Sequence, residues 1–383
     1  MSQDTATAQP DTPVRALPSP PMSAHHGAWI RYGNPLTDDQ VDFAIEHYQA
    51  AILQPWETAA AGRLKAARPD MTVLAYKCLS STRSYESGPV LSSGVGFEEA
   101  EENGEDWFAH RLDGSRIAWA RYPGHWQMAV WDEEYQQRWV DNVVEELDGS
   151  PWDGVMADND VYDDYYGLQP PIEGNRGMGE LRAALDSLVP RAGTALNGVG
   201  KTLVPNIAES RRETGRWAAH AAFGGGFEEV WLAYGAADYL DPMTSLAQMP
   251  ELAGPGLSIM RIASDGTDTH RNFTYGLAAF WVFGGARTAV FTATAHDGYS
   301  GTPFIAQLGW DLGDPVAEPR QRGNGWSREF TGGWAAVNLN DNRRRKVTYP
   351  VPAGMVTVDG RLAPDRVSLD PHEGVLYRKD SAL

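Results

Sequence analysis

At 383 residues, the chain is long enough for an eight-fold βα barrel of about 250 residues together with one appended module. Its formal charge of −19 argues against nucleic acid or an anionic membrane as a partner, so a neutral or cationic ligand is favoured. The single cysteine, Cys78, excludes an intrachain disulfide and a zinc site built from cysteines.

The N-terminal segment contains no targeting signal that we can identify. Residues 1–22 lack a charged stretch followed by an apolar one, and no run of about 18 apolar residues occurs in the chain. We therefore expect either a cytoplasmic protein or a secreted one whose signal peptide has already been removed. Residues 1–24 are polar and rich in proline, which predicts a disordered tail.

From residue 27 onward, strand-like and helix-like segments alternate, as is typical of βα units. We predict a (β/α)8 TIM barrel over residues 25–322. Its strands are expected at 27–32, 51–56, 71–78, 154–158, 203–207, 226–229, 258–263 and 288–292. Helices are expected at 37–47, in an alanine-rich segment that ends at 67, and at 132–147, 178–189, 211–222 and 272–283.

Two further segments complete the expected organisation. The connection from Leu79 to about Gly124 is too long for a routine βα loop, so we expect it to fold over the mouth of the barrel and shape a substrate site. Residues 323–383 contain short strand-like runs separated by turn residues. These runs predict a small antiparallel β module, similar to a β-sandwich.

Two of the predicted strands end in an acid. The runs 153–158 and 224–229 are glycine-led and apolar, and they end at Asp158 and Glu229. In a parallel barrel this end of the strands carries the chemistry, and two carboxylates suffice to cleave a glycosidic bond. We assign Asp158 as the candidate nucleophile. Glu229 is the candidate general acid, because apolar neighbours such as Phe227 would raise its pKa.

Glu228 competes with Glu229 for the second role. Side chains alternate along a strand, so only one of the two can face the barrel axis. When the two runs are aligned, Glu229 stands opposite Asp158, and on this basis we favour Glu229.

Other polar and aromatic residues at predicted strand ends are candidates to bind substrate. They are Arg31, Trp56, Tyr76, Lys77, Asn159, Asn206, Glu209, Glu228, Asp265 and Asp297. Aromatic rings at such positions can stack on sugars, although each can equally fill the core. For Arg31 and Lys77 the alternative is a structural ion pair, and for Asp265 and Asp297 it is a helix cap. Asn206 could instead satisfy a loop backbone.

A denser acidic group follows the fourth barrel strand. Asp158, Asp160, Asp163 and Asp164 are hard oxygen ligands that could hold calcium, but the glycine and terminal glutamate of an EF-hand loop are missing. We therefore predict no metal and no cofactor, and we keep a metal-dependent barrel hydrolase or lyase as an alternative.

The runs at residues 152–159, 225–229 and 332–338 also resemble the corresponding motifs of the glycosyl hydrolase-like family 15. This is a bacterial group of α/β barrels distantly similar to glycoside hydrolase families 66 and 114. The resemblance covers most of residues 26–378. It implies a (β/α)8 barrel that hydrolyses a polysaccharide or oligosaccharide, with Asp158 and Glu229 as the carboxylate pair.

The leading hypothesis is therefore a glycoside hydrolase that needs no cofactor and takes a carbohydrate as its partner. The alternative from a different class is a glycan-binding barrel without catalysis, in which the aromatic residues bind sugar but the acids are not paired. The separation of the two carboxyl groups distinguishes retention from inversion of the sugar configuration, and this separation is a property of the tertiary structure.

Overall fold

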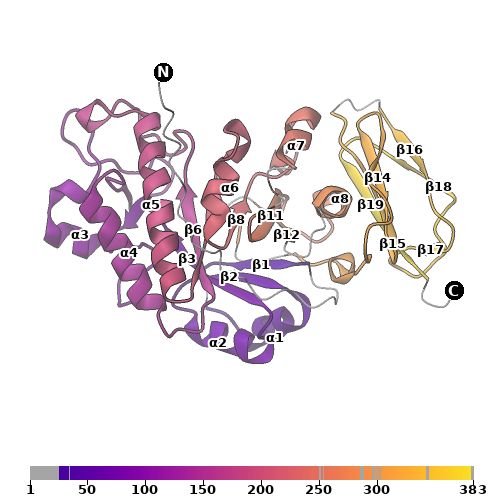
Figure 1. Ribbon diagram of the computed structural model, residues 1–383, viewed down its shortest axis with the longest axis horizontal. Coiled ribbons are helices and arrows are strands. Elements are labelled where there is room, and N and C mark those ends of the chain that lie inside the picture. Colours follow the sequence, from indigo (N-terminus) through magenta and orange to yellow (C-terminus); the bar gives the residue numbers. More distant parts are fainter. Residues whose placement is uncertain are drawn as a thin grey trace, which may run out of the picture.

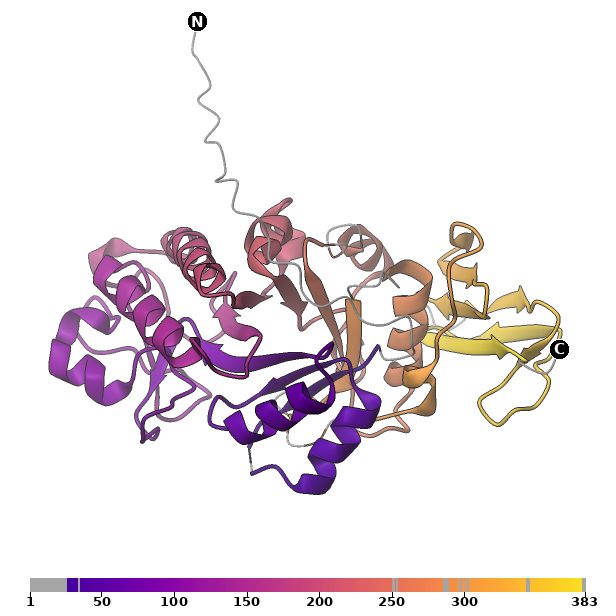
Figure 2. The same ribbon diagram turned by 60° about the horizontal axis from the view of Figure 1, so that its bottom comes forward.

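The computed structural model describes residues 26–380, except for 34, 250, 251, 253, 285–288, 296, 297, 300, 302 and 342–344. The predicted tail at residues 1–24 therefore lies outside the described residues. In Figures 1 and 2, a central sheet surrounded by helices occupies most of the molecule, and a separate β module lies at one end. This arrangement confirms the predicted fold class.

Eight parallel strands form the central sheet, and each lies close to its predicted position. In spatial order they are β1 (Ala28–Arg31), β2 (Ala50–Leu53), β3 (Thr72–Cys78), β6 (Gly154–Asp160), β7 (Thr202–Ile207), β8 (Gly225–Glu228), β11 (Leu257–Ala263) and β12 (Ala289–Thr294). An isolated parallel bridge between Gly27 and Phe291 joins the first strand to the last. The sheet is thereby brought together as a barrel.

Helices follow the strands, and most of them cover the barrel. They are α1 (Asp38–His47), α2 (Thr58–Ala67), α3 (Phe97–Asn103), α4 (Glu133–Leu147), α5 (Met178–Gly198), α6 (Arg216–His220), α7 (Pro242–Gln248) and α8 (Arg271–Ala279). Local sequence explains where several begin. Thr37 and Gln40 form a capping box at the start of α1, and the Asp132 side chain accepts from the Tyr135 amide at 2.9 Å to cap α4.

Two helices differ from the sequence prediction. The helix expected at 178–189 continues to Gly198, because buried side chains such as Ala192 and Leu196 extend its apolar face beyond Pro190. The helix expected at 211–222 is broken into short pieces. Gly215 has a φ of 88°, a left-handed conformation that interrupts the helical backbone before α6.

Glycines at the start of β6 and β8 allow these strands to pack closely against their neighbours. A Cβ atom on Gly154 would lie 2.1 Å from the Thr202 carbonyl oxygen, and one on Gly225 would lie 2.1 Å from the Leu257 carbonyl oxygen. Gly225 also has a φ of 144°, which favours glycine. The glycines at the start of these two runs therefore allow β6 and β8, which carry the acids, to pack closely within the barrel.

The long connection after β3 forms a subdomain beside the barrel. It contains β4 (Ser81–Arg83), which pairs antiparallel with β5 (His125–Gln127), and it also contains α3. In both ribbon views α3 lies at the end of the molecule opposite the C-terminal β module. The Trp139 indole of α4 donates to the Cys78 carbonyl at 2.8 Å and ties the start of the connection to the helical layer.

The C-terminal module consists of two antiparallel sheets. Five strands pair in the order β13 (Arg320–Arg322), β14 (Gly325–Glu329), β15 (Gly333–Asn338), β19 (Glu373–Lys379) and β17 (Met355–Val356), and β16 (Val347–Pro350) pairs with β18 (Arg366–Leu369). A second small core that includes Trp334, Tyr349 and Leu369 lies within the module. Its sheet includes β13, which the sequence boundary at 323 assigned to the barrel.

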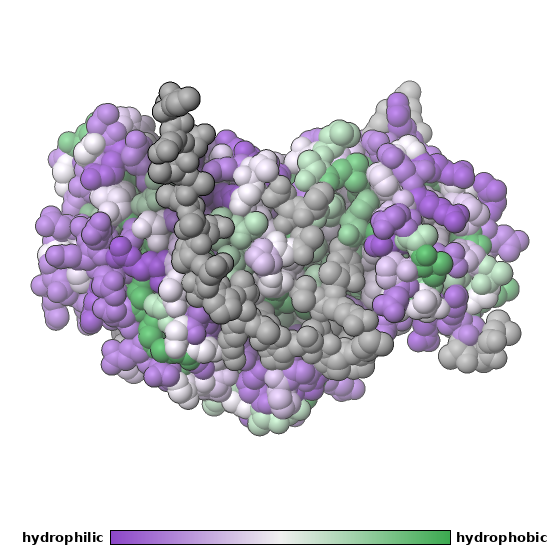
Figure 3. Space-filling view, viewed as in Figure 1, coloured by the Kyte–Doolittle hydropathy of each residue, from purple (hydrophilic) through white to green (hydrophobic). Residues whose placement is uncertain are grey.

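The surface is mainly polar on the face shown in Figure 3. Hydrophilic residues predominate at both ends of this face, and hydrophobic residues gather in a few small groups. In the part of the chain that the structure describes, no helix has both the length and the apolar character that crossing a bilayer requires.

Candidate active site

Asp158 and Glu229 lie together at the C-terminal ends of β6 and β8. The Asn206 side chain, from the intervening strand β7, donates to both: its amide nitrogen is 2.9 Å from Asp158 Oδ1 and 2.8 Å from Glu229 Oε2. Both acids are half-buried, and Asn206 is buried. One amide group of β7 therefore bridges two carboxyl groups from the strands on either side of it.

This bridge sets the separation of the carboxyl groups. Two oxygens at 2.9 and 2.8 Å from one nitrogen lie at most about 5.7 Å apart, and about 5 Å apart where each lies along one of the two N–H bonds of the planar amide. Glycosidases that retain the sugar configuration have carboxyl groups separated by about 5–5.5 Å, and those that invert it have a wider separation of about 6.5–9.5 Å. The pair therefore has the narrow spacing.

The backbone around Asp158 is shaped to present its carboxyl group. The β6–β7 register shifts between Ala157 and Asp160, which marks a bulge, and Asn159 within it has a φ of 69°. The Asn159 amide donates to Asp158 Oδ1 at 2.9 Å. On the other side, the Tyr76 hydroxyl of β3 donates to Asp158 Oδ2 at 2.7 Å. Asp158 thus accepts from three donors: the Asn159 amide, the Tyr76 hydroxyl and the Asn206 side chain.

Tyrosines surround the carboxylate pair. The Tyr299 hydroxyl donates to Glu229 Oε1. The Tyr32 ring lies between its neighbours, with ring centroids 4.9 Å from Tyr76 and 5.1 Å from Tyr299. These rings limit the access of water to the acids, while their hydroxyl groups supply directed hydrogen bonds.

The environment changes the proton affinity of Asp158. Burial and then the negative charge of Glu229 raise its pKa, although the bonds from Tyr76 and Asn206 act in the opposite direction. Two interacting carboxyl groups lose their protons in two steps that belong to the pair. The pair can therefore keep one proton to a higher pH than an isolated carboxyl group would.

Glu228 points away from the pair. Its oxygens accept from the Val230 amide at 3.0 Å and from the Gln248 side chain of α7 at 2.6 Å. Burial raises its pKa to about 7. The alternation of side chains along β8 thus places Glu229 toward Asp158 and Glu228 toward the helical layer, away from any substrate at the pair.

Lys77 and Arg31 do not meet the carboxylate pair. Lys77 is on the opposite face of β3 from Tyr76 and forms a 2.6 Å ion pair with Glu146 of α4, which corrects its assignment to the substrate site. The Arg31 guanidinium donates to the Tyr32 carbonyl, and no ion pair links it to a described carboxylate. Lys77 therefore forms a structural ion pair, which was the alternative to substrate binding. Arg31 is a buried residue at the end of β1.

Two of the predicted acids, Glu209 and Asp265, make their contacts away from the carboxylate pair. Glu209 forms ion pairs with Arg211 at 3.1 Å and Arg212 at 2.5 Å, so neighbouring arginines already occupy its carboxylate. Asp265 is exposed and accepts from the Thr267 amide at 2.9 Å in a local turn. Asp297 lies outside the described residues.

The acidic group after β6 is dispersed. Asp160 pairs with Arg216 at 2.6 Å and His220 at 2.5 Å, Asp163 pairs with Arg212, and Asp164 caps a loop by accepting from the amides of residues 168 and 169. Over the described ranges, no three His, Cys, Asp or Glu side chains are grouped as metal ligands. The calcium alternative therefore loses the ligand cluster on which it depended.

Sequence reasoning missed several residues of the site. Tyr32 and Tyr299 follow the ends of β1 and β12. The position of an aromatic residue just after a predicted strand could have identified them as residues of the site. Arg83 lies in the long connection, and its guanidinium donates to the Tyr76 hydroxyl at 2.9 Å. Arg261 donates to the Glu229 carbonyl at 3.1 Å from β11. No periodicity or motif in the sequence pointed to these two arginines.

Comparison with known proteins gives one match at the level of sequence families. A family model described as hypothetical glycosyl hydrolase family 15 matches residues 65–334. No curated protein matches the chain in sequence.

The fold of the chain is similar to the folds of solved structures. A noncanonic maltogenic α-amylase, AmyB from Thermotoga neapolitana, superposes with a TM-score of 0.51 at 7% identity, covering 94% of this chain and 99% of that one. An α-amylase from Geobacillus thermoleovorans complexed with acarbose gives 0.49 at 10% identity, covering 94% and 99%. Ega3 from Aspergillus fumigatus, complexed with galactosamine, gives 0.47 at 14% identity, covering 77% and 99%. The likeness to AmyB supports the barrel architecture.

Proposed function

The chain belongs to the hypothetical glycosyl hydrolase family 15, and from this membership and its carboxylate pair we propose that it hydrolyses a glycosidic bond in an oligosaccharide or polysaccharide. The observation that carries the proposal is the bridge from Asn206 to Asp158 and Glu229. Two acids so close together are costly to bury unless their proximity serves a purpose.

In this proposal the bond is cleaved in two displacements. Asp158 attacks the anomeric carbon while the bond to the leaving oxygen breaks, and Glu229 donates its proton to that oxygen. Glu229 then takes a proton from water, which attacks the same carbon and releases Asp158. The spacing of about 5 Å leaves no room for water between nucleophile and sugar in the first step, so the sugar configuration is retained.

The roles follow from the hydrogen bonds that each acid accepts. The three donors to Asp158 favour a charged, directed nucleophile. Glu229 accepts from the Tyr299 hydroxyl and shares the Asn206 amide. Because Asp158 accepts one hydrogen bond more than Glu229, we assign the nucleophile to Asp158 and the proton donor to Glu229.

A glycan-binding barrel without catalysis is the second candidate. Such a protein would gain no benefit from two like charges held at this spacing, because uncharged donors and aromatic rings bind sugars without the cost of repulsion. The paired acids therefore favour catalysis over binding alone.

The test is the hydrolysis of a polysaccharide panel by Asp158→Asn and Glu229→Gln variants. Each amide keeps the shape of the side chain but cannot act as nucleophile or proton donor, so we expect reducing-sugar release to fall by about a thousand-fold. Asp265→Asn is the matched control, because it changes an exposed acid after a neighbouring strand. Full activity in either of the first two variants would refute the assignment.

A further inference from the structure

A cleft of about 630 Å³ opens over the C-terminal ends of the first three barrel strands. Its lining comes from Gly33 after β1, from Gln54 and Trp56 after β2, and from the segment 83–91 of the long connection. Arg83 lines this cleft and donates to the Tyr76 hydroxyl, which in turn donates to Asp158. Two consecutive hydrogen bonds, from Arg83 to Tyr76 and from Tyr76 to Asp158, therefore connect the cleft lining to the carboxylate pair.

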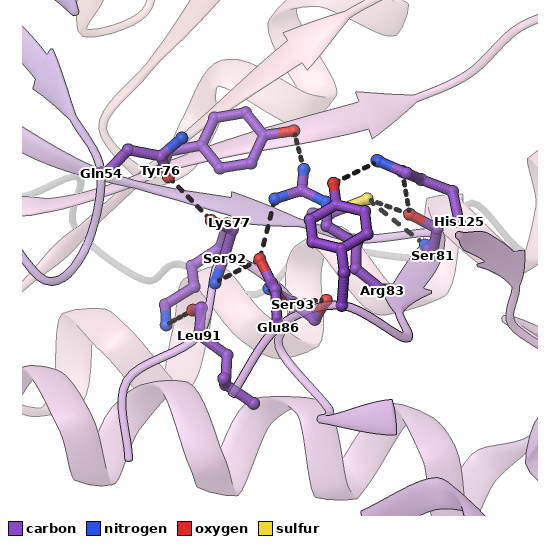
Figure 4. A network of polar contacts seen from close by, with 12 residues as sticks. Gln54, Tyr76, Lys77, Ser81, Arg83, Glu86, Leu91, Ser92, Ser93 and His125 are labelled. Carbon is purple, nitrogen blue, oxygen red and sulfur yellow. Dashed lines mark hydrogen bonds and ion pairs between the residues drawn. The ribbon is translucent and has the colours of Figure 1, made fainter. Parts of the chain in front are cut away.

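The polar floor of the cleft is hydrogen-bonded and carries no net charge. Arg83 and Glu86 form a buried ion pair of 3.0 Å, and Glu86 also accepts from the amides of Ser92 and Ser93, both at 3.1 Å. Figure 4 shows these groups converging on Glu86, with the Tyr76 hydroxyl beyond Arg83. Although burial opposes ionisation, Arg83 and the bonds from Ser93 lower the pKa of Glu86. The two fixed charges cancel, so an ionised ligand finds no unbalanced partner.

Two aromatic side chains of the cleft are open to solvent. Trp56 is 47% exposed and Tyr85 is 61% exposed. The Tyr85 hydroxyl is held against His125 Nε2 at 2.8 Å, which limits the movement of its ring. Flat apolar faces beside a polar floor match a pyranose ring, which has C–H groups on its faces and hydroxyl groups at its edge.

Hydrogen-bond donors remain available at the same place. The Gln54 side chain accepts from the Ser92 hydroxyl at 2.7 Å, but its amide nitrogen bonds to no residue within the described ranges. The Arg83 Nε atom is buried without a described partner, which is costly unless a ligand or water completes its hydrogen bonding. The Gln54 side chain is half-exposed, so its amide nitrogen is open to a ligand in the cleft.

We propose that this cleft binds an uncharged pyranose unit next to the unit that is cleaved, with the ring on Trp56 and its hydroxyl groups on Gln54 and Arg83. The inference rests on the proposed function and names its substrate class: an oligomer of neutral sugars that extends from the carboxylate pair across β1–β3. Such an enzyme hydrolyses longer oligomers better than short ones, because the extra contact orients the scissile bond.

The test measures binding separately from hydrolysis. Asp158→Asn protein is titrated with maltohexaose, cellohexaose, xylohexaose and chitin hexamer, and with hexamers of galacturonic acid and glucosamine as charged probes. We expect at least one neutral hexamer to bind and Trp56→Ala in the same background to weaken its binding about ten-fold. Phe43→Ala is the matched control, since Phe43 is 42% exposed on α1 outside the cleft.

Each result has a defined meaning. Unchanged affinity in the Trp56→Ala variant, binding of the charged hexamers alone, or no binding in the panel would overturn the cleft assignment. Melting temperatures verify that every variant is folded. In the enzyme with Asp158 intact, loss of hexamer hydrolysis but not of trimer hydrolysis by Trp56→Ala supports the cleft. Hydrolysis that survives Asp158→Asn defeats the proposed function instead, so the two failures are distinguishable.

Discussion

The Tyr76 hydroxyl lies 2.7 Å from Asp158 Oδ2 and donates to it from the adjacent strand. The same hydroxyl accepts from Arg83 at 2.9 Å. Because the cationic guanidinium polarises the hydroxyl, it strengthens the bond that the hydroxyl donates to the carboxylate. Burial and the charge of Asp158 raise the pKa of Tyr76, so the phenol stays protonated and remains a donor.

Removing this donor is expected to impair the nucleophile. In Tyr76→Phe, the charged form of Asp158 loses a hydrogen bond, so its pKa rises and the acidic limb of the rate profile moves to higher pH. A bond to a charged group contributes about 1.5–3 kcal/mol, which corresponds to about a 10- to 160-fold loss of kcat. Rates measured between pH 4 and 9 test both effects.

A suitable control is Tyr349→Phe. It removes another buried hydroxyl, which donates to the Val337 carbonyl at 2.8 Å in the C-terminal module. The two variants share a loss of buried hydrogen bonding, but only the first touches Asp158. An unshifted acidic limb together with an unchanged kcat in Tyr76→Phe would contradict the role of this tyrosine.

Asn206→Ala tests the bridge itself. The wild-type amide stabilises the charged form of Asp158, so its loss raises the pKa of Asp158 and moves the acidic limb of the rate profile to higher pH. We expect the maximal rate to fall about 100-fold, because the spacing of the carboxyl groups is no longer held. Asn142→Ala is the control, since Asn142 also donates to a carboxylate, Glu99 at 2.9 Å, but from α4. A profile unchanged in position would speak against the bridge.

Glu228 is expected to affect stability. Its usual pKa of 4.5 is raised to about 7 by burial, so the folded state holds a proton that the unfolded state releases. The protonated Glu228 carboxyl group makes its full contribution to the free energy of unfolding below pH 4.5. As pH rises through about 7, this contribution is lost, which lowers the free energy of unfolding by up to about 3 kcal/mol. Glutamine cannot ionise. Relative to wild type, Glu228→Gln should therefore gain stability between pH 5 and pH 8.

Urea unfolding at those two pH values measures the difference. Glu145→Gln serves as the control, because Glu145 is exposed on α4. If Glu228→Gln and wild type keep a constant difference in the free energy of unfolding across this range, the buried carboxyl group does not hold its proton.

His220 makes a second pH-dependent contribution to stability, over a higher pH range than Glu228. Burial disfavours its charged form, but Asp160 and then Asp186 outweigh this effect and raise the pKa to about 9. The contribution is therefore complete below pH 6.5 and disappears as pH rises through about 9. We expect the stability advantage of wild type over His220→Gln to shrink between pH 6 and pH 10. Calorimetry or urea unfolding at both ends of the range is decisive, and an advantage independent of pH would rule out a charged His220.

Local patterns in the sequence determined the elements of the barrel and the strands that carry acids. The eight parallel strands were predicted close to their positions, because a short apolar run bounded by glycine or a helix cap depends on neighbouring residues alone. The same runs identified Asp158 and the pair Glu228 and Glu229 as acids at strand ends. Helix interruption at Gly215 was missed, since a single left-handed glycine overrides a helical pattern.

Only the tertiary structure decided which groups meet. Whether Glu228 or Glu229 faces Asp158, and that Asn206 joins the pair, depends on the register and closure of strands separated by many residues in the chain. Arg83 reaches Tyr76 from the long connection, whose path no periodic pattern describes. A strand pattern specifies where a side chain stands along its own backbone. Distances between side chains of different strands arise only when burial of the shared core brings those strands together.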